Sequence, residues 1–229
     1  MSYSEKEPDL LRYVIQKVHM TLSLTFPSHA GSEMVKVLVG EQRKTYIFHK
    51  TLLTSRCPYF EKCLTASFSE GRNNEVVLEE ENCEEFDHLF RWIYTGQLDL
   101  NIKLPFGGLY VLANRFCMER FKSLIVDALI NYLRDHDAPV DELSPLAEHH
   151  LPSSPPAILL MRQIAYELAA QHDSLYVERL RALCDALGDA EAMAEFFDML
   201  ADMFHRKAAG VLTNPADHPY WETHISYTS

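Results

Sequence analysis

Hydrophobic positions near the start of the chain fall into short runs separated by polar turns. The run at 34–39 is closed by Gly40 and a charged turn, and a second run follows at 45–48. β-Branched and aromatic residues on both sides of a short glycine-containing loop are the pattern of a β-hairpin. A third run, at 75–79, follows two asparagines and predicts a third strand, and we expect a short edge strand at 98–100.

Between and after these strands the apolar spacing becomes helical. Residues 49–64 fit two helical segments that meet at Pro58, and residues 83–95 give the clearest amphipathic stripe. Further stripes within 109–116 and 124–133 predict a pair of helices. The order hairpin, helices, strand and helices predicts an α+β fold with a small sheet.

Helical spacing returns in the last third of the chain. Apolar stripes predict three helices, within 159–168, 177–187 and 196–204. We therefore expect an all-α C-terminal domain at 157–210, followed by a tail at 211–229.

Residues 135–156 have no regular apolar spacing and contain five prolines, three of them close together. Proline-rich segments without periodicity are typical of linkers. We interpret 135–156 as an exposed Pro-rich linker and expect it to be the most protease-sensitive part of the chain.

The hairpin and helix segments also carry spaced motifs. These are V-K-V-L-V-G, then Y-I-F-H-K-T-L-L-T-S-R-C-P-Y-F, then F-S-E, then V-V-L, then F-x-x-L-F-R-W-I-Y-T-G-Q-L. In this order they closely resemble the BTB/POZ domain, over residues 31–134. The resemblance implies a small, mostly antiparallel sheet with an added edge strand, flanked by a cluster of helices. It also implies a non-enzymatic interaction module with the fold markers His49, Lys50, Tyr94 and Gly96. Glu33 departs from the family, which usually carries Asp there.

The predicted C-terminal helices resemble those behind the BTB/POZ domain in many filamentous-fungal proteins. Family members that recruit cullin scaffolds carry a hydrophobic-x-Glu motif, which Phe68 and Glu70 match. An exposed ring beside a carboxylate suits a partner surface, because the ring can fill a pocket while the charge fixes the register.

The N-terminal segment, residues 1–30, holds a further amphipathic pattern at 9–26. This helix either packs on its own domain or, as in dimeric members of the family, crosses to a partner subunit. In the second case the dimer interface contains Leu10, Leu11, Val14, Ile15 and Val18.

Two functional hypotheses follow from the resemblance. In the first, the chain recruits client proteins to a cullin-based ubiquitin ligase. In the second, it is a self-associating scaffold or transcription-related regulator without a ligase role. A hydrolase within the C-terminal helices is a third hypothesis, which requires a pocket-lined His or Cys there.

Charge and cysteine usage narrow the classes further. The net charge is −12, of which −1 belongs to residues 1–134 and −11 to the rest, which argues against direct nucleic-acid binding. Five cysteines without a C-x-x-C pair predict reduced thiols in an intracellular protein of the cytoplasm or nucleus. No apolar run reaches the length of a membrane span, so we expect no membrane association.

Catalytic and metal-binding patterns give no lead. The adjacent pair His149-His150 cannot place two ligands on one helix face, and no Cys or carboxylate stands at a zinc-like interval. There is no nucleophile elbow and no phosphate-binding loop. The acidic run 79–81 continues to the start of the predicted helix at 83, where the helix dipole favours negative charge. We therefore expect no enzyme activity, no cofactor and no metal.

Overall fold

The computed structural model describes residues 33–65, 73–100, 103–170, 176–188 and 190–217. The residues between these ranges and at both ends lie outside the description. The predicted helix at 9–26, with Leu10, Leu11, Val14, Ile15 and Val18, falls there, as do Phe68 and Glu70.

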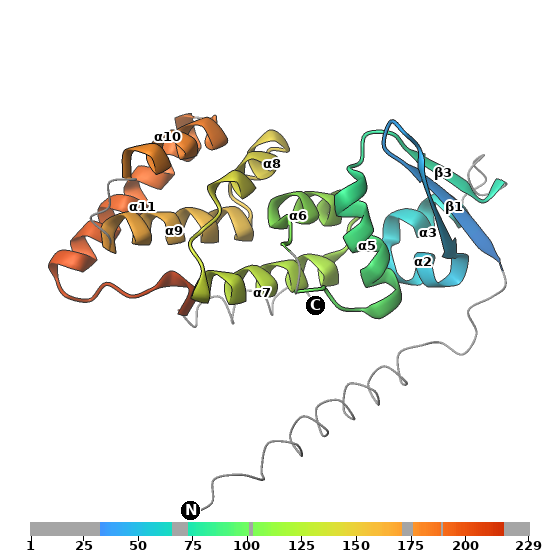
Figure 1. The fold of residues 1–229 in the computed structure, drawn as a ribbon, viewed down its shortest axis with the longest axis horizontal. Helices are drawn as coiled ribbons and strands as arrows, with labels where there is room; N and C mark the ends of the chain where they lie inside the picture. Colours follow the sequence, from blue (N-terminus) through green and yellow to red (C-terminus); the bar gives the residue numbers. More distant parts are fainter. Residues whose placement is uncertain (1–32, 66–72, 101–102, 171–175, 189, 218–229) are drawn as a thin grey trace, which may run out of the picture.

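A three-stranded mixed sheet forms one end of the molecule (Figure 1). Strands β1 (Met34–Val39) and β2 (Lys44–His49) pair antiparallel, and β3 (Glu75–Leu78) joins the other side of β1 in parallel. The turn between β1 and β2 needs a left-handed residue, which Gly40 provides with φ +73°. The expected α+β fold is confirmed. No strand forms at 98–100, where Asp99 instead approaches Arg91 at 3.5 Å.

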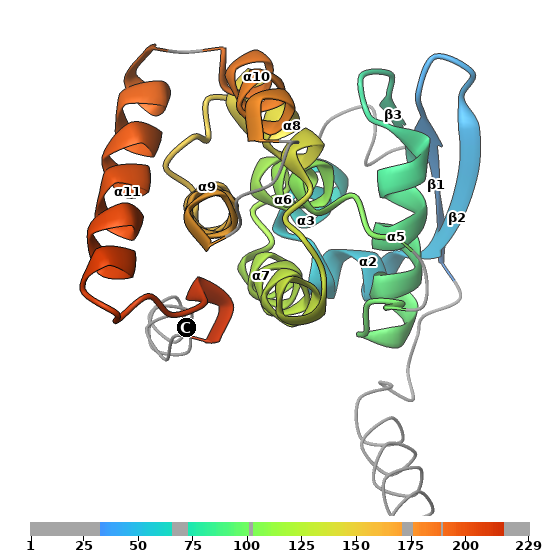
Figure 2. The same ribbon diagram turned by 60° about the vertical axis from the view of Figure 1, so that its left-hand side comes forward.

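Helices cover one face of this sheet (Figure 2). The short helices of the pair following β2 meet at Pro58, and the helix following β3 begins at an Asn82 side chain that caps Glu84 N–H at 2.7 Å. Gly96 ends that helix in the left-handed conformation. The bounds are α2 (Lys50–Arg56), α3 (Pro58–Thr65), α5 (Cys83–Thr95), α6 (Phe106–Arg115) and α7 (Glu119–Asp135).

Aromatic side chains join the sheet to α5, and we call this cluster the aromatic joint. Phe86 packs against Tyr46 with ring centroids 4.8 Å apart, and Phe48 packs against Phe90 at 4.9 Å. Tyr94 stacks on Phe48 at the same place. Phe48 and Phe86 are fully buried, so the joint excludes water and contributes apolar burial.

A helical region follows α7, and the three predicted C-terminal helices are confirmed. Helix α9 lies in its interior, because its residues are apolar on most sides, and α10 and α11 lie outside it. The elements are η1 (Val140–Glu142), α8 (Leu143–Glu148), α9 (Pro155–Ala170), α10 (Tyr176–Leu187), α11 (Ala190–Ala208) and η2 (Pro215–Asp217). We call residues 140–217 the C-terminal helical region.

The interpretation of 135–156 as an exposed linker is wrong. Leu143 and Leu146 are buried, and the segment contains η1 and α8. Its prolines stand just before or within the first turns of helices, as Pro139 before η1, Pro145 in α8 and Pro155 at the start of α9. Proline is tolerated at those positions because its missing N–H has no helical partner there.

Two buried glutamates tie this segment to its neighbours, and we call their contacts the carboxylate joint. Glu142 Oε2 accepts a hydrogen bond from Gly107 N–H at the start of α6, at 2.7 Å. Glu167 of α9 accepts from Ala138 N–H at 2.9 Å and pairs with Arg179 of α10, which also donates to Ala138 C=O. Together with apolar contacts that run without a break from the sheet to η2, these bonds dock the C-terminal helical region on α6 and α7.

Candidate functional site

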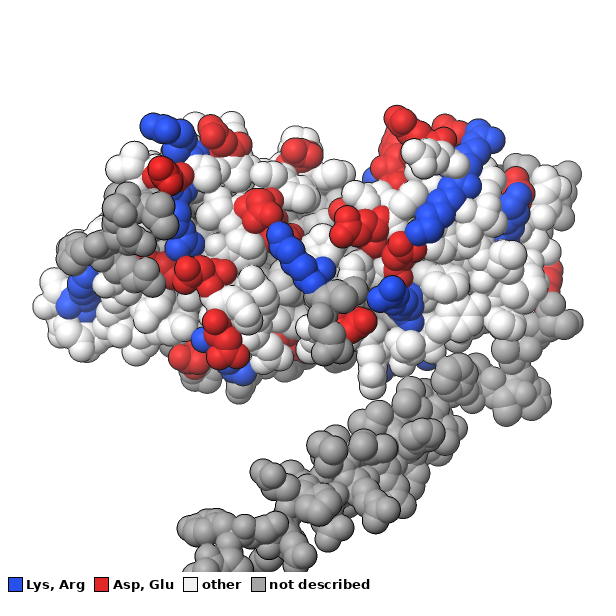
Figure 3. All heavy atoms as spheres, viewed as in Figure 1, with Lys and Arg blue, Asp and Glu red and all other residues white. Residues whose placement is uncertain are grey.

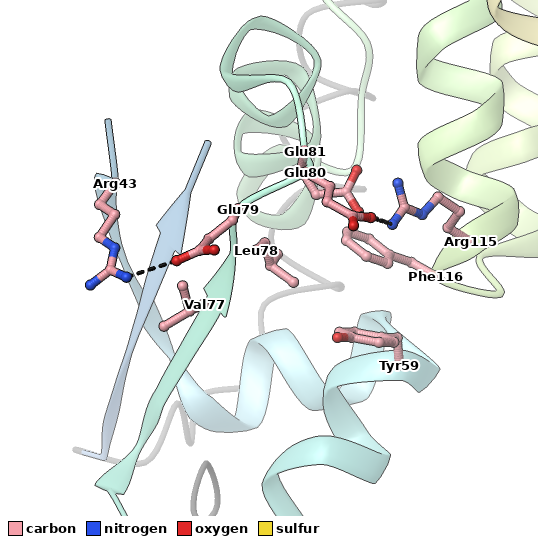
Figure 4. A pocket seen from close by; sticks show the side chains of 9 residues that line it. All are labelled: Arg43, Tyr59, Val77, Leu78, Glu79, Glu80, Glu81, Arg115 and Phe116. Atoms are coloured by element: carbon pink, nitrogen blue, oxygen red, sulfur yellow. Dashed lines mark hydrogen bonds and ion pairs between the residues drawn. The ribbon is translucent and has the colours of Figure 1, made fainter. Parts of the chain in front are cut away.

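A cavity of about 560 Å³ opens at the edge of the sheet, where β3, α3 and the end of α6 meet. Figure 4 shows its lining side chains converging from these elements and from the β1–β2 turn. The lining residues are Arg43, Tyr59, Val77, Leu78, Glu79, Glu80, Glu81, Arg115 and Phe116.

The apolar part of the cavity wall is aromatic. Tyr59 and Phe116 stack with ring centroids 4.8 Å apart and planes 23° apart. Phe116 is held from behind by Phe60 and Phe86, at 5.5 and 6.5 Å. Burial raises the pKa of the Tyr59 phenol to about 12, so this group stays neutral at physiological pH and offers an apolar ring with one polar tip.

Ion pairs form the polar rim. Arg43 binds Glu79 at 2.7 Å on one side, and Arg115 lies 3.3 Å from both Glu80 and Glu81 on the other. Burial raises the pKa of Glu81, and the Arg115 guanidinium opposes that shift. Figure 3 shows acidic side chains gathered at this end of the molecule, over the connection from β3 to α5.

The chemistry of this site is suited to binding. Aromatic rings surrounded by exchangeable ion pairs are typical of surfaces that hold a partner side chain and fix its register. Among the residues that the structure describes, no group of His, Cys, Asp or Glu is arranged to hold a metal ion. Cys57 lies behind Phe116 and is fully buried, and burial raises its pKa to about 12, so it is a core thiol.

The predicted partner residues Phe68 and Glu70 belong to the connection between α3 and β3. Helix α3 ends at Thr65 and β3 begins at Glu75, and both elements line the cavity through Tyr59 and Val77. The sequence motif and the cavity therefore share the same two flanking elements.

Two of the fold markers, His49 and Lys50, tie strand ends together. Lys50 Nζ donates to Glu33 Oε1 and Asn74 Oδ1, each at 3.0 Å, and Asn74 donates to the same Glu33 oxygen at 2.9 Å. These bonds from Asn74 and Lys50 lower the pKa of Glu33. His49 contacts the Tyr94 hydroxyl through its backbone N and Nδ1, both at 3.2 Å. The polar bonds fix where β1 starts and where β2 leads into α2.

Sequence reasoning missed the cavity residues Arg43, Tyr59, Arg115 and Phe116. They come from four separate segments, and no local pattern joins them. The available signals were the left-handed conformation of Arg43 in a tight turn and two aromatic rings flanking short helices, which read as core in the sequence.

The fold and the site define a class of protein. A small mixed sheet set against helical pairs, with an aromatic cavity at its edge, is a scaffold for binding other proteins. Residues 33–133 match the model of the BTB/POZ domain, so this part of the chain is a BTB/POZ domain, a protein–protein interaction module.

Distant relatives share the same domain. The chain is 35% identical over 77 residues to Rho-related BTB domain-containing protein 1 of Mus musculus, and 36% identical over 76 residues to that of Homo sapiens. The alignments cover 34% and 33% of this chain, and the chain spans only 11% of the length of these relatives. No helix of the described residues is long and apolar enough to cross a bilayer.

Proposed function

We propose that this chain is a BTB adaptor that recruits client proteins to a cullin-based ubiquitin ligase. The supporting observation is the aromatic cavity between α3 and β3, the two elements that flank Phe68-Ser69-Glu70. In this proposal Phe68 anchors the cullin, Glu70 sets its register, and the ion pairs of the cavity rim lie at the edge of the contact.

The division of labour follows the two parts of the molecule. The BTB/POZ domain, at 31–134, binds the scaffold, and the helices at 157–210 select the client. Because the C-terminal helical region is docked on α6 and α7 through the carboxylate joint, a bound client is held at a defined distance from the scaffold. A fixed geometry favours transfer between partners that never touch each other.

A calorimetric titration with the N-terminal domain of a cullin tests this proposal. We expect binding in the micromolar range or tighter, about −8 kcal/mol. Phe68→Asp and Arg115→Glu should each abolish or strongly weaken it, because a charge enters the anchor or reverses at the cavity rim. Val177→Asp places the same charge on an exposed position of α10 and serves as the matched control.

Absence of heat at two temperatures would contradict the adaptor proposal. The alternative is then a self-associating scaffold or transcription-related regulator that uses the 9–26 helix at a dimer seam. Leu11→Asp combined with Ile15→Asp should disrupt that seam and leave cullin binding intact, which distinguishes the two functions.

A further inference from the structure

Helix α11 carries two apolar stripes, although one is enough to pack it on α9. The first stripe is buried and consists of Ala192, Phe196, Leu200 and Met203. The second lies about 100° around the helix, which is the angle of one residue at 3.6 residues per turn. All its members are exposed: Ala194, Phe197, Ala201, Phe204 and Ala208.

The spacing of this exposed stripe alternates between three and four residues. That is the heptad pattern with which one helix packs along another. Phe197 is 50% exposed and Phe204 is 41% exposed, two turns apart on the same face. Single exposed apolar residues are ordinary, but this continuous row is a patch that calls for a partner. The alanines between the rings would let a second helix come close.

The surroundings of α11 leave this face accessible. Figure 2 shows α11 as the outermost described helix, with α9 on its inner side and no other described element beyond it. The face is also distant from the cavity at the sheet edge, at the opposite end of the molecule in Figure 1.

Charge along α11 indicates the occupant. The N-terminal half carries Glu195 and Asp198 beside the stripe, and the C-terminal end carries His205 and Arg206. Asp202 binds Arg206 at 2.7 Å where the two halves meet. A parallel copy of the same helix would bring acid against acid, whereas an antiparallel copy brings each acidic half against a basic end.

We propose that α11 is a homotypic docking surface, on which the exposed stripe of a second copy packs antiparallel. A two-fold axis near Ala201 would bring Phe197 of each copy close to Phe204 of the other, which is the self-complementary contact that such symmetry requires. This surface goes beyond the adaptor function, because it uses neither the cavity nor Phe68 and Glu70. It also differs from the dimer seam of the 9–26 helix.

Sedimentation velocity of the full chain, from about 1 to about 200 µM, tests the proposal. We expect a reversible dimer. Phe197→Ser with Phe204→Ser should raise the dissociation constant about tenfold or more, as for the anchors of an interface. Val177→Ser, on an equally exposed apolar position of α10, should leave it unchanged. Circular dichroism melts verify that all variants fold.

Two further arms make the test specific. Leu11→Asp with Ile15→Asp should retain the α11 dimer, whereas its loss would assign self-association to the N-terminal segment and overturn the proposal. Glu195→Lys with Asp198→Lys should stop self-association, and so should His205→Glu with Arg206→Glu. Mixing these two variants should restore a heterodimer, because each acidic half again meets a basic one.

A wild-type chain that stays monomeric at the highest concentration would also overturn the proposal. The face would then belong to another segment of this chain or to a different protein.

Discussion

The aromatic joint and the carboxylate joint hold neighbouring parts of one molecule by opposite chemistry. In the aromatic joint, rings such as Phe48 and Phe86 pack without charge and without water. In the carboxylate joint, Glu142 and Glu167 accept hydrogen bonds from backbone groups of other segments. The first joint gains free energy from buried area, which tolerates small shifts, whereas the second depends on geometry and on the ionisation of its carboxyl groups.

The largest effect we expect comes from truncating the aromatic joint. Phe86→Ala removes a fully buried ring that packs on Tyr46, Phe48 and Phe116. The free energy of unfolding should fall by about 3–5 kcal/mol, from lost apolar burial plus a residual cavity. Urea denaturation measures this change. Ile47→Ala, on the exposed face of β2, is the control and should cost about 0.5 kcal/mol or less.

The carboxylate joint should give the next largest effect. Glu167→Ala leaves the Ala138 N–H and the Arg179 guanidinium without their acceptor. We expect a loss of about 2–3 kcal/mol in the free energy of unfolding, because a buried donor and a largely buried charge lose their partner. Glu167→Gln keeps an oxygen for the Ala138 N–H and should recover part of the loss. Equal losses for both variants would show that charge alone carries this joint.

The difference between the joints also explains what the sequence could predict. The aromatic joint follows from period: the stripe of α5 and the alternation of β2 each place rings on one face, so the α+β fold and most of the helices could be read directly. The carboxylate joint could not, because its bonds connect residues 35 and 29 positions apart, and a glutamate in a polar segment reads as exposed. For this reason 135–156 was expected to be a linker.

Gly107 illustrates the same limit. In the sequence, the pair Gly107-Gly108 only indicates a helix start. In the structure, a Cβ on Gly107 would lie 2.2 Å from the Glu142 carbonyl oxygen, so the glycine allows the close approach of two segments. The cavity at the sheet edge was missed for a similar reason, since Arg43, Tyr59 and Arg115 come together only in the folded chain.

The smallest effect we expect is a dependence of stability on pH, which the carboxylate joint has and the aromatic joint lacks. Burial raises the pKa of Glu142 to about 7, against the opposing bond from Gly107 N–H. Burial also raises the pKa of the neighbouring Glu85 to about 7, with repulsion from Glu81 and Glu142 acting in the same direction. The folded state therefore holds protons that the unfolded state releases above the ordinary value of 4.5.

The sign follows from this difference in bound protons. Stability from these groups is fully present below about pH 4.5 and is lost as pH rises to about 7. His88 acts in the opposite direction within this window, because burial lowers its pKa, so the comparison of variants is more telling than the wild-type profile. Glu142→Gln keeps an acceptor for Gly107 N–H and removes the charge. Urea denaturation between pH 5 and 8 should show a flatter profile for this variant, by about 1–3 kcal/mol across the window. Glu148→Gln, on an exposed position of α8, should follow the wild-type profile, and a slope unchanged in Glu142→Gln would mean that this carboxyl does not titrate with folding.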